Sequence, residues 1–213
     1  MTFPELYIIC KKSETSLIYL LSRFICYRMR GKLLFLHQKV RIKGIINIQT
    51  KRLLTVGISY YGFLHKNDIS MLNIEGKLNI NGNVTLGRGC RLDIGRDAVV
   101  NIGQDTFIGP FSNIIIQHGL QIGEASSISW NCRFLDEDFH HLDYEGKKES
   151  SNKKIVIGNH VWIGNNVAFY KGVLIADGSV VAADSVVKSR FEEENVLIAG
   201  NPAKIVKRNI HWQ

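Results

Sequence analysis

Residues 155–189 read IVIGNHVWIGNNVAFYKGVLIADGSVVAADSVVKS, and an aliphatic residue followed by a small residue returns in them at steps of six. Ile157-Gly158 and Ile163-Gly164 show the step, and similar pairs extend upstream to Ile94-Gly95. This period matches neither an α-helix nor a strand of an ordinary sheet, but it suits a coil with three flat sides, each pointing one aliphatic side chain inward. The sequence therefore predicts an all-β chain wound as a parallel β-helix.

The period also divides the chain into parts. Residues 1–70 are predicted to form a basic segment, helical at first and then irregular, and residues 71–200 form the β-helix. The repeat stops over residues 136–154, which are too polar for a coil side and are predicted to form an extruded loop. Over residues 201–213, Asn201-Pro202 reads as an N-cap followed by proline at the first helical position, which predicts a short C-terminal helix.

The formal charge of +8 is concentrated near the N-terminus, where residues 1–52 hold eleven Lys and Arg against two Glu. Nucleic acid is disfavoured as a partner because no aromatic stacking platform or reading-head motif accompanies this charge. Residues 16–30 read as a helix with one largely apolar side. That helix either packs on the β-helix or a neighbouring subunit, or rests on an anionic membrane surface.

The sequence favours a cytoplasmic protein, with the inner membrane face as the alternative. Its apolar runs are shorter than the ~20 residues that cross a bilayer. Glu5 and Lys11 interrupt any apolar core of a secretory signal. The four cysteines lack the spacing of disulfide or metal sites, which is typical of reduced, mostly buried thiols.

Three stretches resemble the hexapeptide-repeat acyltransferases: residues 157–189, the closing IAGNPAKIVKRNIHW at 198–212, and LDEDFHHL at 135–142. The nearest members are the maltose and galactoside O-acetyltransferases and the O-acetyltransferases of bacterial surface polysaccharides. The resemblance covers residues 72–212. It implies a left-handed β-helix, assembled as a homotrimer with acetyl-CoA in the groove between adjacent subunits.

The loop motif supplies candidate catalytic residues. Acetyl transfer to a hydroxyl needs a base that takes the hydroxyl proton, and histidine meets that need near neutral pH. His140 lies at the position of the family's catalytic histidine, and Asp138 or Asp136 is expected to orient its ring. His141 stands where relatives commonly have proline, and it is an alternative base or a ligand of the substrate.

The resemblance also assigns contacts with acetyl-CoA to residues of the C-terminal half, namely Trp162, Gly164, Asn165, Ala183, Lys188, Ser189, Lys204 and Lys207. Ala183 matches a small residue whose backbone faces the pantetheine arm, whereas Lys188 and Ser189 replace a Thr-Lys pair. Lys204 and Lys207 are candidates for binding the CoA phosphates as point charges.

Zinc is the competing site chemistry, because His118, His140 and His160 follow one another at roughly the length of one coil. The γ-class carbonic anhydrases of this fold hold zinc with three histidines at a subunit interface. The Asp-rich loop does not resemble that branch, so no metal is expected. The leading function is a CoA-dependent O-acetyltransferase acting on a sugar hydroxyl of a surface polysaccharide. The alternatives are N-acetylation of a nucleotide-linked amino sugar and a non-catalytic trimeric β-helix scaffold.

Overall fold

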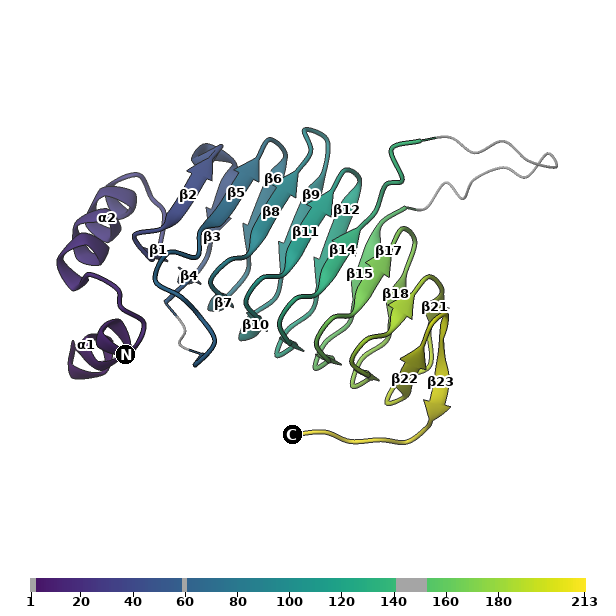
Figure 1. Ribbon diagram of the computed structural model, residues 1–213. Helices are drawn as coiled ribbons and strands as arrows, with labels where there is room; N and C mark the ends of the chain where they lie inside the picture. The colour runs from purple at the N-terminus through teal and green to yellow at the C-terminus, as the bar shows by residue number, and fades with distance from the viewer. Residues whose placement is uncertain (1–2, 59–60, 141–152) are drawn as a thin grey trace.

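The computed structural model describes residues 3–58, 61–140 and 153–213, and within them the chain winds as a parallel β-helix (Figure 1). Successive strands pass in turn through three sheets, here called A, B and C, so the coil has a triangular cross-section. This confirms the all-β architecture that the six-residue period predicts.

The strands of each sheet are paired in parallel, one coil after another. Sheet A contains β1 (Leu34–Leu36), β4 (Leu54–Val56), β7 (Val84–Leu86), β10 (Thr106–Ile108), β13 (Ser127–Ile128), β16 (Trp162–Ile163), β19 (Val180–Val181) and β22 (Leu197–Gly200), with β23 (Ala203–Lys207) added antiparallel at its edge. Sheet B contains β2 (Val40–Lys43), β5 (Ser70–Ile74), β8 (Arg91–Ile94), β11 (Asn113–Ile116), β14 (Arg133–Leu135), β17 (Ala168–Tyr170) and β20 (Val186–Val187). Sheet C contains β3 (Ile48–Thr50), β6 (Lys77–Ile80), β9 (Val99–Ile102), β12 (Gly119–Ile122), β15 (Ile155–Ile157), β18 (Leu174–Ile175) and β21 (Arg190–Phe191).

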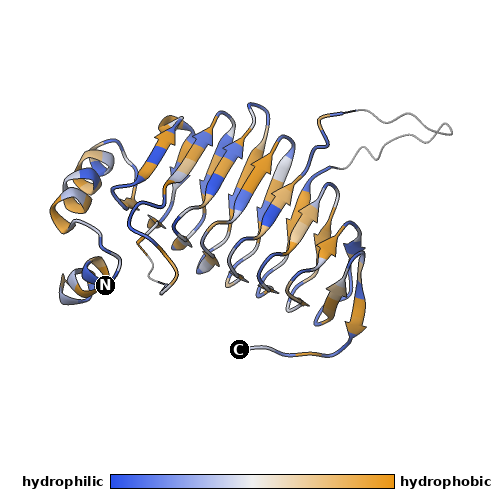
Figure 2. Ribbon diagram, in the orientation of Figure 1, coloured by the Kyte–Doolittle hydropathy of each residue, from blue (hydrophilic) through white to orange (hydrophobic). Residues whose placement is uncertain are grey.

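The aliphatic residues of the period stack in columns inside the coil. In sheet A the register aligns one such column, whose members are all fully buried: Val56, Leu86, Ile108, Ile128, Ile163, Val181 and Ile198. Each buried aliphatic side chain contributes about 1.5–3 kcal/mol. Figure 2 shows polar bands between the apolar ones on the strands, as expected when alternate side chains face solvent.

The β-helix starts earlier than the sequence predicts, at Leu34 rather than near residue 71. Strands β1 to β4 and a 3₁₀ turn at Ile45–Asn47 already form a complete coil, with Leu34, Ile48 and Leu54 buried in the common core. A long excursion between β4 and β5 interrupts the period there, so the first coil has no regular spacing to the next.

Two helices cover the N-terminal end of the coil, as predicted for the first part of the chain (Figure 1). They are α1 (Phe3–Lys12) and α2 (Leu17–Met29), and the Ser16 hydroxyl caps α2 by accepting the Tyr19 N–H. The fully buried Leu20 packs α2 onto the coil, which confirms packing on the β-helix. Within the described residues, neither helix is long and apolar enough to span a bilayer.

The predicted C-terminal helix over residues 201–213 is wrong. The chain reverses at Asn201-Pro202, whose peptide bond is cis, and continues as β23 along β22. Ala203 is buried and Ile205 packs on the core, whereas Lys204 between them is exposed, which is the alternation of a strand. Pairing with β23 satisfies the edge of sheet A, and this outweighs the local helix signal.

Candidate active site

The predicted loop leaves the coil at the corner between sheets B and C, after β14 (Figure 1). Asp136, its first residue, is fully buried. Its carboxylate accepts the backbone N–H groups of Gln117, His118 and Gly119 at 2.7, 2.8 and 2.8 Å. Charged acceptors make the stronger hydrogen bonds in proteins, so Asp136 ties the start of the loop to the preceding coil.

Ion pairs hold both ends of the loop. Glu137 binds Lys153 Nζ and His118 Nε2, each at 2.7 Å, and Asp138 binds Lys171 Nζ at 2.6 Å. The hydrogen bond from Lys153, followed by that from His118, lowers the pKa of Glu137 to about 2. Residues on both sides of the loop are thus joined at its base, which fixes where the loop departs from the coil.

His140 lies at the end of this anchored segment and is exposed. The preceding residue, Phe139, is also exposed and has a φ of 62°, which is uncommon for a residue other than glycine. Among the residues that the structure describes, no hydrogen bond joins His140 to Asp136 or Asp138. His141 lies outside the described residues.

The predicted CoA ligands lie elsewhere on the coil. Trp162 is 43% exposed on β16 of sheet A, and Gly164, Asn165 and Ala183 lie at the corner between sheets A and B. An added Cβ at Gly164 would lie 2.5 Å from the Ala183 nitrogen, so this glycine lets adjacent coils stack closely.

Of the remaining predicted CoA ligands, Lys204 and Lys207 are exposed on β23 at the edge of sheet A. Lys188 and Ser189 instead lie at the B–C corner, two coils beyond the loop. There the Lys188 ammonium lies 5.9 Å from the centre of the Tyr170 ring. In a triangular coil the B–C corner is opposite sheet A, so within one chain His140 and Trp162 belong to opposite sides.

Sequence reasoning missed Trp212. The segment after β23 returns along the coil (Figure 1), and the Trp212 ring stacks on His160 with centroids 4.1 Å apart and planes at 6°. Its indole N–H donates to the His160 carbonyl at 2.9 Å, and Trp162 lies 6.2 Å away. Trp212 itself was visible in the sequence. The helix predicted for residues 201–213 gave no reason to place its ring against His160.

The three histidines considered for zinc are not gathered at one corner. His118 lies at the B–C corner, where it binds Glu137, and His160 lies at the corner between sheets C and A, where it stacks on Trp212.

The stacked coils with a loop at one corner are typical of the left-handed hexapeptide-repeat proteins, and residues 154–189 match the model for the bacterial transferase hexapeptide, with six repeats. An uncharacterised 24.8 kDa protein in the cps region of Klebsiella pneumoniae is 44% identical over 207 residues, covering 96% of this chain and 92% of that protein. The chain belongs to the hexapeptide-repeat acyltransferase family and is an acyltransferase.

Two solved structures share the fold. The polySia-specific acetyltransferase NeuO is 26% identical with a TM-score of 0.53, over 84% of this chain and 71% of that one. AntD, an N-acyltransferase from Bacillus cereus, was solved in complex with dTDP and 3-hydroxybutyryl-CoA. It is 18% identical with a TM-score of 0.54, over 82% of this chain and 79% of that one.

Proposed function

We propose that this protein is a CoA-dependent O-acetyltransferase that transfers the acetyl group of acetyl-CoA to a sugar hydroxyl in the biosynthesis of a bacterial surface polysaccharide. The observation that carries the proposal is an exposed histidine, His140, near the start of a loop whose base is fixed by the buried Asp136. The likeness to NeuO, an acetyltransferase specific for a glycan, supports a sugar acceptor.

His140 acts as the general base in this proposal. Its neutral imidazole takes the proton of the acceptor hydroxyl while the oxygen attacks the thioester carbonyl, and CoA leaves as the thiol after receiving a proton. Asp138 is the proposed orienter of the ring, because Asp136 already accepts three backbone N–H groups. Lys171 pairs with the Asp138 carboxylate at the base of the loop. His141 remains the alternative base.

A homotrimer fits the arrangement of the predicted ligands. His140 and the residues proposed to bind acetyl-CoA on sheet A lie on opposite sides of one coil. A neighbouring copy that brings its sheet A beside this loop would complete the site. We therefore propose that acetyl-CoA binds between subunits, against Trp162 and the lysines of β23.

Peripheral contact with the inner membrane face is part of the proposal. Ile18, Ile25 and Met29 are exposed along α2, and the basic Arg28 lies in its last turn, as on helices that rest on anionic lipid. Flotation with vesicles containing anionic lipid would test this contact. An unchanged distribution after Ile25→Ser and Met29→Ser replacement would contradict it.

The test of the activity is the release of the CoA thiol from acetyl-CoA in the presence of neutral and acidic oligosaccharides and of nucleotide-linked amino sugars. Transfer to the oligosaccharides is expected, and transfer to amines alone would favour N-acetylation. His140→Ala should lower turnover by about 10²–10⁴-fold. The exposed His65 provides the control as His65→Ala. If the protein neither binds acetyl-CoA nor transfers acetyl, the alternative of a non-catalytic β-helix scaffold is favoured instead.

A further inference from the structure

A groove runs over the outer face of sheet B, on the half of the coil nearest the N-terminus. Its volume is about 560 Å³, and its lining comes from β2, β5, β8 and β11. A second hollow of about 310 Å³ shares Asn113 and Ile115 with it and continues over β14 and β17. Together they form a track along the coil that reaches Leu135, the residue before the loop.

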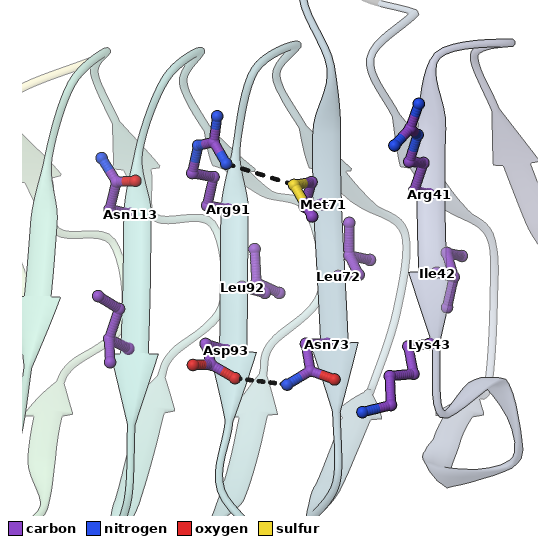
Figure 3. A pocket seen from close by; sticks show the side chains of 11 residues that line it. Arg41, Ile42, Lys43, Met71, Leu72, Asn73, Arg91, Leu92, Asp93 and Asn113 are labelled. Atoms are coloured by element: carbon purple, nitrogen blue, oxygen red, sulfur yellow. Dashed lines mark hydrogen bonds between the residues drawn. The ribbon is translucent and has the colours of Figure 1, made fainter.

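Arginines recur along one row of this track. The strand register aligns Arg41, Met71, Arg91, Asn113 and Arg133, so an arginine occurs on every second strand. Two strand spacings amount to about 9.6 Å. Figure 3 shows Arg41 and Arg91 in this row, with Met71 between them.

These arginines are available to a ligand. Arg41, Arg91 and Arg133 are exposed, and within the described residues none of them pairs with a carboxylate. The Arg91 guanidinium donates to the Met71 sulfur at 3.3 Å, and among residues 3–58, 61–140 and 153–213 it has no other side-chain hydrogen bond. A guanidinium presents a planar fork of donors that matches a carboxylate, so three unpaired guanidinium groups favour an anionic ligand of extended shape.

The neighbouring row is polar and close to neutral. Asp93 accepts the Asn73 amide at 2.8 Å, and Lys43 pairs with Glu75 at 3.7 Å (Figure 3 shows Lys43, Asn73 and Asp93). In the arginine row, Asn113 lies between Arg91 and Arg133, and the oxygen of its amide can accept from a hydroxyl group. The groove thus combines regularly spaced positive charge with partners for hydroxyls.

We propose that the outer face of sheet B binds a linear acidic glycan, with carboxylated sugars recurring at about the length of a disaccharide and pairing with Arg41, Arg91 and Arg133. The inference rests on the proposed function, since the bound glycan is the acceptor of the acetyl group. The track runs along the coil toward the loop, so a glycan held there points its next sugars at His140.

Calorimetry of the full chain with a hyaluronan oligosaccharide tests the inference without acetyl-CoA, because that glycan carries one carboxylate per disaccharide. Binding that weakens with added salt is expected, with maltooligosaccharide as the neutral comparison. The combined Arg41→Gln, Arg91→Gln and Arg133→Gln variant should lose about tenfold in affinity, the sum of three modest surface pairs. Lys51→Gln, Arg52→Gln and Lys77→Gln remove the same charge from outside sheet B and should preserve binding.

Three results would overturn the inference. The first is hyaluronan binding that is unchanged in the arginine variant. The second is single-stranded DNA that binds equally well through the same arginines. The third is a change of oligomeric state confined to that variant, which would make this face a subunit contact. The proposed function fails separately. If the wild-type protein binds hyaluronan through the arginines but transfers acetyl to no sugar, the glycan site on sheet B stands and the proposed acetyltransferase activity is wrong.

Discussion

The Asp136 carboxylate accepts the backbone N–H of His118 at 2.8 Å, across the corner between two successive coils. Asp136 is the residue at which the period stops, and it is fully buried. The same carboxylate binds the N–H groups on either side of His118. The loop that carries His140 therefore begins from a point fixed by three bonds rather than from a free strand end.

Asp136→Asn should destabilise the protein by about 1–3 kcal/mol, because an amide directs two N–H donors where the carboxylate accepted bonds and leaves buried groups unpaired. Urea unfolding measures the loss. Asp138→Asn changes an exposed ion pair and should stay within about 0.5 kcal/mol. Equal effects of the two variants would contradict a structural role for Asp136.

Gly164→Ala should also destabilise, by about 1–3 kcal/mol, because its new Cβ would lie 2.5 Å from a backbone nitrogen of the next coil. At Gly62 an added Cβ meets no atom within 4 Å, so Gly62→Ala serves as the control. Thermal unfolding distinguishes them. A Gly164→Ala protein as stable as wild type would show that the coils can separate at this corner.

The regular coils were predictable because their signal is local. An aliphatic residue and a small residue recur in each short stretch, and the Gly164 contact shows why a small residue stands there. The first coil lacked that signal, since the excursion after Val56 separates it from the next. At the C-terminus, proline suggested a helix, whereas the decisive partner of β23 was the open edge of β22.

The position of the loop was predictable for the same reason, because the interruption of the period at Asp136 marked it. His140 was chosen from the resemblance of LDEDFHHL to the family's loop motif, and its role stays a prediction. The pairing of Trp212 with His160 joins residues 52 positions apart, and nothing local in the sequence indicates it. The arginine row of sheet B was hidden for the same reason, because its members come from different coils.

Stability should fall as the pH drops from about 6.5 toward 4. His37 is fully buried, and burial, followed by the charge of Arg88, lowers its pKa from 6.5 to about 4. Above pH 6.5 the His37 ring is neutral in both the folded and the unfolded state, so its contribution to the free energy of unfolding is complete. Below 6.5 the unfolded chain binds the proton first, and the contribution is lost down to the folded pKa.

Unfolding in urea at about pH 7 and about pH 4.5 measures this dependence. His37→Asn should reduce it, because asparagine can keep an acceptor for the Lys39 N–H without titrating. His65 is exposed and accepts the equivalent bond from Asn67, so His65→Asn is the matched control. A pH dependence unchanged in His37→Asn would exclude His37 as its source.

Removing the Trp212 ring should release the C-terminal segment and weaken acetyl-CoA binding. The ring stacks on His160 and donates to its carbonyl, and it lies beside Trp162, the proposed CoA contact. Trp212→Ala should cost ~1 kcal/mol through the lost stack. It should also speed digestion by carboxypeptidase and raise the dissociation constant for acetyl-CoA several-fold.

His211→Ala, an exposed change in the same segment, should do neither. A folded Trp212→Ala protein with unchanged acetyl-CoA affinity would place this segment outside the site.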